Sequence, residues 1–426
     1  MFEKLLETFF QGAVKKGTLG VTFADGRTAR YGTAAPDFPD VSIRFTSARA
    51  ARRIVTDPAL GAAEAFMDGS LVVAGDDILG LVRLFRANAP WERGASMRPP
   101  RPLRRLKDKA LHKLASYNAA RSSKKNVAHH YDLGNDFYRL FLDRQMQYSC
   151  AYWPREGMTL DEAQEAKLAH IAAKLHLEPG MTVLDIGCGW GGLAIWLAKR
   201  CGARVTGITL SEEQLALARQ NAQDAGVADR VTFELIDYRD MAARGDRFDR
   251  IVSVGMFEHV GQPQFETFFR ACSNLLTDQG VMMLHTIGLM GKPGVTDAFT
   301  RKYIFPGGYI PALSETVAAS EPVRLMIADV EILRLHYAYT LLAWYDRCVA
   351  HRAEIEAMFG AKFYRMWLFY LAGAATGFES SALCNFQIIY TRDRHALPIT
   401  RGWIEAAEER LASSAPVTDT EREAAE

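Results

Sequence analysis

The sequence predicts an α/β protein with an open, mostly parallel sheet that follows a small α+β domain. Three observations support this fold class. From Met181 onward, short apolar runs typical of buried strands alternate with segments of helical periodicity. The first of these runs leads directly into a glycine-rich turn and a helix. Residues 1–92 instead place alternating strand patterns before helical ones and contain no cluster of catalytic residue types.

The composition is typical of a folded protein of more than one domain. The chain has 426 residues, of which 49% are hydrophobic, with a formal net charge of +1, which excludes intrinsic disorder. Six cysteines without CxxC spacing favour reduced thiols in a cytoplasmic protein. The neighbours His129 and His130 are poorly placed to share one ion, so no metal is expected. No signal peptide opens the chain, and the apolar stretch 366–378 is too short to cross a bilayer.

The N-terminal domain is expected to hold a hairpin and several short helices. Asp25-Gly26 is a turn signal between two alternating segments, and Asp57-Pro58 and Met67-Asp68-Gly69 interrupt the helical pattern. The expected elements are an amphipathic helix at 2–16, hairpin strands at 19–23 and 27–31, a third strand at 41–45 and helices between 48 and 88.

A basic linker, residues 93–125, separates the two domains. Its many lysines and arginines face few acidic residues, and Pro99-Pro100 marks a break in structure. The segment is either a solvated linker or a surface for anionic phospholipid, where each basic residue contributes about 1 kcal/mol. Nucleic acid is not expected, because no motif of interleaved aromatic and basic residues is present. The tail 412–426 is acidic and expected to fray.

The second domain, residues 126–411, is expected to form the parallel sheet. Ligands of such sheets bind beyond the carboxyl ends of the strands, so the residues after each strand are candidates for a site. Thr209 stands where a nicotinamide-binding protein needs an acidic residue for the ribose, which argues against such a dinucleotide. The expected strands are 181–186, 203–209, 231–236, 248–254 and 280–284, with helices at 193–200, 212–225 and 265–276.

The glycine-rich turn is the strongest single signal. Asp185, Gly187, Gly189 and Gly191 have the spacing Asp-x-Gly-x-Gly-x-Gly between a strand and a helix. Glycine allows backbone angles that a Cβ forbids and lets a ligand approach the main chain, and the following helix N-terminus attracts negative charge. The turn resembles the first motif of S-adenosylmethionine-dependent methyltransferases.

Further motifs make the resemblance specific. Between about residues 126 and 392 the chain resembles the cyclopropane-fatty-acyl-phospholipid synthase family, and Ala62–Gly69 extends the likeness more loosely. The motifs are 130–135, 147–152, 184–191, 256–261, 284–288, 303–308 and 336–341.

The resemblance implies a Rossmann-like class I methyltransferase sheet with helical lid insertions, preceded by an α+β domain that associates with lipid. It implies methyl transfer from S-adenosylmethionine to the cis double bond of a phospholipid acyl chain, giving a cyclopropane, with bicarbonate as the base. The residues it implies for the cofactor are Tyr148, Ser149, Asp185, Gly187, Gly189, Gly191, Thr209, Gln214, Tyr238 and Arg239. Those it implies around bicarbonate are Cys150, Glu258, His285, Ile287 and Tyr337.

The chemistry of such a reaction sets its own demands. An alkene is a weak nucleophile, so close positioning must supply much of the catalysis, and a carbocation requires a site without water. Closing a three-membered ring needs a base. Glu258 and His285 follow different strands at the same sheet edge and are expected to meet there, although Glu258 as a simple helix cap is the alternative.

Other functions stay open at this point. The same fold forms methyl- or methylene-branched fatty acids, methylates small amines, or binds lipid without catalysis. The expected partner is the anionic surface of a phospholipid bilayer, with the protein cytoplasmic and peripheral at the inner face of the membrane. A homodimer is left open, as are acyl length, double-bond position and head group.

Overall fold

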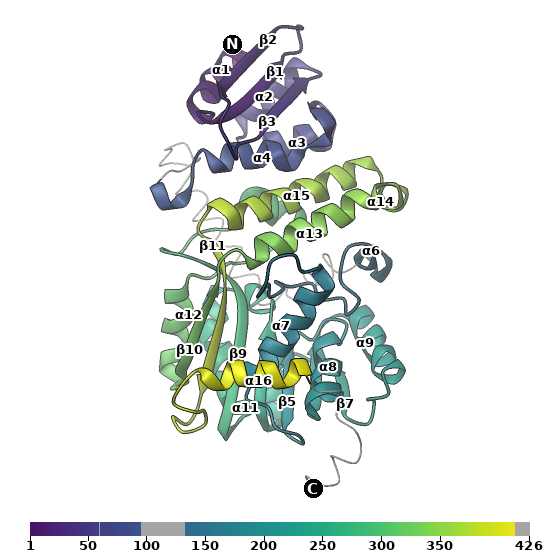
Figure 1. Ribbon diagram of the computed structural model, residues 1–426, viewed down its shortest axis with the longest axis vertical. Coiled ribbons are helices and arrows are strands. Elements are labelled where there is room, and N and C mark those ends of the chain that lie inside the picture. The colour runs from purple at the N-terminus through teal and green to yellow at the C-terminus, as the bar shows by residue number, and fades with distance from the viewer. Residues whose placement is uncertain (59, 95–132, 414–426) are drawn as a thin grey trace. The chain divides into compact units, whose positions relative to one another are not determined.

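The computed structural model describes residues 1–58, 60–94 and 133–413 (Figure 1). Most of the basic linker and of the acidic tail therefore lies outside the described residues, as does the motif at 130–135 apart from its last three residues. The chain gathers into two compact units, each made of separate segments. Unit 1 comprises Met1–Lys107, Thr296–Pro306 and Tyr337–Leu383, and unit 2 comprises Asp108–Val295, Gly307–His336 and Cys384–Glu426.

Unit 1 contains a four-stranded sheet in the order β2-β1-β3-β4. The predicted hairpin is confirmed, because β1 and β2 pair antiparallel around Gly26, whose φ is 88°. β3 then pairs parallel with β1. The three-residue strand β4 was not predicted, since it is too short to show alternation. The elements are α1 (Phe2–Ala13), β1 (Gly17–Thr22), β2 (Thr28–Thr33), β3 (Asp40–Phe45), α2 (Ala48–Thr56), α3 (Gly61–Met67), β4 (Leu71–Val73) and α4 (Ile78–Ala87).

Three helices from late in the chain complete unit 1: α13 (His336–Ala350), α14 (Arg352–Phe359) and α15 (Ala361–Ser380). In Figure 1, α15 lies alongside α3 and α4. The guanidinium of Arg83 on α4 donates to both carboxylate oxygens of Glu379 on α15, at 2.9 and 2.6 Å. Lys302 and Tyr303 both donate to Glu64 on α3, at 2.7 and 2.8 Å. These contacts join segments that are far apart in the sequence into one unit. The domain boundaries predicted from the sequence are continuous ranges instead, and they stay a prediction.

Unit 2 is the predicted α/β sheet, now with seven strands in the order β10-β11-β9-β8-β5-β6-β7. β7, β6, β5, β8 and β9 are parallel, and β10 and β11 pair antiparallel with each other. The five predicted strands are confirmed, but the last is longer than expected, and β10 and β11 were missed. The strands are β5 (Thr182–Ile186), β6 (Arg204–Thr209), β7 (Val231–Leu235), β8 (Phe248–Val254), β9 (Leu276–Leu289), β10 (Met326–Leu333) and β11 (Leu383–Thr391).

Helices cover both faces of this sheet and create two apolar cores. Neighbouring residues of a strand point to opposite faces, so Val183 packs in one core and Leu184 in the other. The first core includes α8 and α9, and the second is dominated by Phe268 and Phe269 of α11. The helices are α6 (Asn135–Arg139), α7 (Leu160–Lys174), α8 (Gly192–Cys201), α9 (Glu212–Asp224), α10 (Tyr238–Arg244), α11 (Phe265–Leu275), α12 (Leu313–Ser320) and α16 (Gly402–Ser413).

Among the described residues, no helix has the length and apolar character needed to cross a membrane. The apolar stretch 366–378 forms the middle of α15.

The second core gives a prediction about stability. Phe268 is fully buried, with its ring centroid 5.1 Å from that of Phe257 and 5.3 Å from that of Tyr238. Phe268→Ala should lower the free energy of unfolding by about 3–5 kcal/mol, because it removes apolar contacts and leaves a cavity. Urea denaturation followed by circular dichroism measures the change. Leu235→Ala, at a residue 39% exposed, is the control and should cost about 0.5 kcal/mol or less. Equal costs for the two variants would contradict this account of the core.

Candidate functional site

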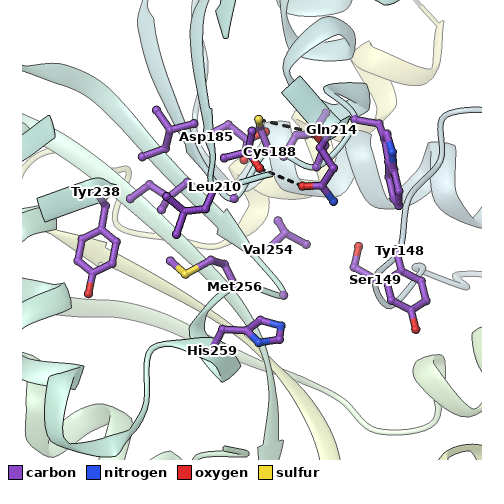
Figure 2. Close-up of a pocket in the computed structure, with 18 of the residues that line it drawn as sticks. Tyr148, Ser149, Asp185, Cys188, Leu210, Gln214, Tyr238, Val254, Met256 and His259 are labelled. Atoms are coloured by element: carbon purple, nitrogen blue, oxygen red, sulfur yellow. Dashed lines mark hydrogen bonds between the residues drawn. The ribbon is translucent and has the colours of Figure 1, made fainter. Parts of the chain in front are cut away.

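A pocket lies at the carboxyl ends of β5, β6, β7 and β8 in unit 2, the edge where the sequence places its candidates (Figure 2). Every residue predicted to hold the cofactor lines it except Gly191. Leu210, Val254 and His259 also line it and were not singled out from the sequence. Figure 2 shows the His259 ring directed into the same cavity as Tyr148 and Ser149.

The three glycines of the turn have different roles. All have positive φ, at 84° for Gly187, 55° for Gly189 and 83° for Gly191. A Cβ at Gly187 would lie 2.8 Å from Met256 Cβ, and one at Gly191 would lie 2.6 Å from Phe233 Cζ. A Cβ at Gly189 would meet nothing within 4 Å. Packing therefore requires glycine at the two outer positions, while Gly189 leaves space open beside the pocket.

The end of β6 presents an oriented amide. Ser211 caps α9 by accepting from the Gln214 N–H at 3.3 Å. The Thr209 hydroxyl donates to Gln214 Oε1 at 2.9 Å, which turns the Gln214 amide nitrogen toward the pocket (Figure 2). Both side chains are buried. Thr209 thus orients the Gln214 side-chain amide, a neutral hydrogen-bond donor, at the end of the strand where a dinucleotide-binding site has a carboxylate.

Arg239 follows β7 and is held by its own neighbour. Asp237 caps α10 by accepting from the Arg239 N–H at 2.9 Å, and its carboxylate accepts from Nε and Nη2 of Arg239 at 2.7 Å each. The hydrogen bonds to this carboxylate raise the pKa of Arg239 above its usual value. The guanidinium is therefore a fixed cation at the pocket wall.

A buried lysine, which the sequence analysis missed, supports residues 147–153, a segment rich in aromatic residues that we call the aromatic loop. Lys167 on α7 has no exposed surface and donates from Nζ to Gln147 Oε1 at 2.7 Å and to Ser149 Oγ at 2.9 Å. Burial lowers its pKa to about 8, opposed by attraction to Asp143 and Asp185. The sequence contains a pattern that could have identified this lysine, because Lys167, His170 and Lys174 recur at helical spacing among apolar residues.

Asp185 is the acidic residue of the turn and faces the pocket. It is 2% exposed, and its Oδ2 has no hydrogen-bond partner. Burial raises its pKa to about 7, and Lys167 opposes this shift. A buried carboxylate oxygen without a partner is costly unless a ligand supplies a donor or a positive charge. The pocket therefore suits a cationic ligand.

Glu258 and Ile287 meet at the neighbouring edge, after β8 and within β9. Glu258 is 8% exposed, its Oε1 accepts from the Ile287 N–H at 2.6 Å, and its Oε2 has no hydrogen-bond partner. Burial raises its pKa to about 7, countered in part by hydrogen bonds from Ile287 and Thr286. Glu258 directly precedes the pocket residue His259 in the chain. Like Asp185, it is therefore a buried carboxyl group with an oxygen that has no hydrogen-bond partner, and it lies next to the pocket wall.

The other residues predicted around bicarbonate have different surroundings. His285 is 1% exposed, and its ring nitrogens contact Asn385 and Gln387 of β11 at 2.9 and 3.1 Å. The Cys150 thiol is buried and donates to Ala151 O at 3.3 Å. Tyr337 belongs to unit 1, where its ring packs against Trp344 and Phe378. Within unit 2, the structure thus shows a hydrogen bond between two of the predicted residues, Glu258 and Ile287.

Comparisons with known proteins match this architecture. Residues 118–388 match the family model of mycolic acid cyclopropane synthetase, and residues 2–89 match a domain family of unknown function. The chain is 41% identical over 290 residues to a probable fatty acid methyltransferase of Pseudomonas putida, covering 66% of this chain and 73% of that protein. It is 43% identical over 263 residues to the cyclopropane-fatty-acyl-phospholipid synthase of Escherichia coli K12, covering 62% of this chain and 66% of that protein.

Comparison with solved structures leads to the same family. The cyclopropane synthase MmaA2 from Mycobacterium tuberculosis superposes with a TM-score of 0.60 at 34% identity, over 63% of this chain and 97% of that one. The mycolic acid cyclopropane synthase CmaA1, complexed with S-adenosylhomocysteine and CTAB, gives a TM-score of 0.59 at 34% identity, with the same coverage. Because the family match includes the cofactor pocket and the Glu258 turn, the chain belongs to the mycolic acid cyclopropane synthetase family and is an S-adenosylmethionine-dependent methyltransferase.

Proposed function

We propose that this methyltransferase converts the cis double bond of an unsaturated acyl chain in a membrane phospholipid to a cyclopropane. The observation that supports it best is Glu258, a buried carboxyl group with one unpaired oxygen and a pKa near 7 next to the pocket wall. Cyclopropane formation requires a base for a carbon-bound proton, whereas transfer to an amine does not. The names of the relatives, which act on fatty or mycolic acids, support the same class of substrate.

The pocket residues fit S-adenosylmethionine. The open position at Gly189 lets a ligand approach the backbone, and the unpaired Asp185 Oδ2 suits a positively charged ammonium or sulfonium group. The polar wall formed by Gln214 and Arg239 offers donors to hydroxyl or carboxylate oxygens. When bound there, S-adenosylmethionine supplies an electrophilic methyl group.

Glu258 then acts on the product of methyl addition. With the cofactor bound, one alkene carbon would take the methyl group while the sulfur of S-adenosylmethionine leaves with the bonding electron pair, and a carbocation would remain on the neighbouring alkene carbon. Loss of one proton from the new methyl group releases the electron pair that closes the ring. Ionised Glu258 takes this proton at Oε2, or holds there the hydroxyl of a bicarbonate ion that takes it. Loss of a proton from a neighbouring chain carbon would instead give an unsaturated, methyl-branched chain, and a hydride shift before loss of a methyl proton would give a methylene branch.

Bicarbonate remains part of the proposal and fits Glu258 best. A bicarbonate hydroxyl would donate to the unpaired Oε2, so that the two anions share a proton instead of repelling each other. A hydrogen bond from His285 to the ion would compete with Asn385 for the same ring nitrogen. We also retain the anionic inner face of the membrane as the place of action and a homodimer as the alternative to a monomer.

The first prediction concerns the cofactor. Gly189→Val should abolish binding of S-adenosylmethionine, because its side chain fills the space open beside the pocket. Gly180→Val is the matched control, since Gly180 also has a positive φ, 84°, and free space around its Cβ position, but does not line the pocket. Calorimetric titration measures affinity. If Gly189→Val folds and binds as tightly as Gly180→Val, the glycine turn is not the cofactor site.

The second prediction concerns the base. Since burial sets the pKa of Glu258 to about 7 and only the ionised form accepts a proton, turnover should rise as pH passes through about 7 and level off above it. Glu258→Gln should lose about 10²–10⁴-fold in turnover. The assay is mass spectrometry of phospholipid vesicles with and without bicarbonate. The control is Glu266→Gln, at an exposed carboxylate of α11. Full activity of Glu258→Gln would exclude this residue as base or ion holder.

The third prediction concerns the membrane. Reversing Arg104, Arg105, Lys107 and Lys109 to glutamate should weaken binding to anionic vesicles, because each basic residue near the surface contributes about 1 kcal/mol. The remaining binding should depend less on salt. Vesicle sedimentation at low and high ionic strength measures both effects. Unchanged binding by the variant would favour the solvated linker.

A further inference from the structure

His285 is enclosed by a row of buried polar side chains from three elements of unit 2. Lys174 on α7, His285 on β9, and Asn385 and Gln387 on β11 are each no more than 1% exposed. Lys174 Nζ donates to Gln387 Oε1 at 2.7 Å, and Gln387 Nε2 lies 3.1 Å from His285 Nδ1. On the far side of the ring, Nε2 lies 2.9 Å from the amide nitrogen Nδ2 of Asn385.

The direction of every hydrogen bond in this row follows from the lysine. Glu331 on β10 contacts Lys174 and stays ionised, because hydrogen bonds and charge from His170 and Lys174 hold the pKa of Glu331 well below its usual value. Burial lowers the pKa of Lys174, and the charge and hydrogen bond of ionised Glu331 oppose that shift and favour the ammonium, which has three donors and no acceptor. Gln387 must therefore turn Oε1 toward Lys174 and its NH₂ group toward His285. Nδ1 can then only accept.

The opposite ring nitrogen must hold the hydrogen. A neutral imidazole has one donor and one acceptor, so an accepting Nδ1 leaves Nε2–H as the donor. The structure sets Asn385 Nδ2 against this nitrogen, and exchanging the O and N positions of that amide brings Oδ1 to the Nε2–H donor. This orientation also gives a partner to Asn385 Oδ1, a buried oxygen that otherwise has none.

We propose that Lys174, through Gln387, is a positioning residue that holds His285 as the neutral Nε2–H tautomer and prevents it from taking a proton. The proposal deepens the proposed function and rests on it for the catalytic consequence, not for the tautomer. A protonated ring would need Nδ1–H to face the NH₂ group of Gln387. Because His285 cannot take the proton, the base must be Glu258 or an ion that Glu258 holds. His285 also stays uncharged, so it does not repel the carbocation that the site must stabilise.

The charged groups near the ring act in the same direction. Lys167, Lys174 and His170 on α7 face His285 and disfavour a positive charge on it, and only Glu331 favours one. Together with burial, which is the largest effect, they hold the pKa of His285 well below its usual value. Protonation of His285 is thus opposed both by hydrogen-bond geometry and by charge.

Nitrogen NMR of protein with ¹⁵N-labelled histidine tests the tautomer directly, with His285→Gln used to assign the signal. In the wild type, Nδ1 should show the shift of an unprotonated nitrogen and Nε2 that of a protonated one, unchanged between about pH 5 and 9. A protonated Nδ1, or a ring that titrates in this range, would overturn the proposal.

Two isosteric variants on β11 form a matched pair. Gln387→Glu replaces the donor at Nδ1 by an acceptor, so the hydrogen should move from Nε2 to Nδ1, or the ring should become charged. Asn385→Asp keeps an acceptor at Nε2 and should leave Nδ1 unprotonated. If the two variants behave alike, or if only Asn385→Asp changes the ring, the assigned directions are wrong. Circular dichroism establishes that each variant is folded.

Turnover on vesicles of unsaturated phospholipid separates this inference from the proposed function. Gln387→Glu should lose about 10–100-fold in kcat, the range seen when a hydrogen-bond partner of a metal-bound histidine is removed, with the KM for S-adenosylmethionine unchanged. Wild-type protein with the expected NMR signature but without turnover would refute the phospholipid substrate and leave the tautomer standing. Turnover with the opposite signature would refute the tautomer alone.

Discussion

Helix α7 buries two lysines in unit 2, and the polar arrangement of the sheet edge depends on how their charges are satisfied. Lys167 and Lys174 lie about two turns apart on the same face of α7, and neither has exposed surface. A buried ammonium must be hydrogen-bonded or it is lost to deprotonation. Lys167 meets this need with the aromatic loop at Gln147 and Ser149, and Lys174 with Glu331 and Gln387. One helix therefore fixes both the loop over the cofactor pocket and the surroundings of His285.

This arrangement explains which parts could be predicted. The strands β5 to β9 and the glycine turn are local patterns, so apolar runs and glycine spacing were enough, and the fold class is confirmed. β10 and β11 were missed because they join the sheet from the far end of the chain. The contacts of His285 with Asn385 and Gln387 depend on β11, so the sequence indicated His285 as a strand-end candidate but not the partners of its ring nitrogens.

The gathering of late helices with the N-terminal unit is a second non-local feature. Nothing in the pattern of 337–383 indicates that Glu379 pairs with Arg83 or that Arg365 donates to Met67 O at 2.9 Å. Such pairs form between surfaces that only the folded chain brings together. The buried polar face of α7, by contrast, was readable, because charged residues at helical spacing on an apolar face require buried partners.

Two buried carboxyl groups, Asp185 in the pocket and Glu258 next to its wall, have pKa values raised to about 7 for the same reason: each is buried and has one oxygen without a hydrogen-bond partner. The charged groups around the two carboxylates differ. Asp185 lines the pocket near Lys167, and a cationic ligand placed there favours its ionised form, so binding releases a proton. Glu258 has no cation among the groups that shift its pKa, only hydrogen bonds from Ile287 and Thr286. Its pKa therefore stays near neutrality, which suits the role of base that we propose for it, whereas Asp185 suits the role of holding a cationic ligand.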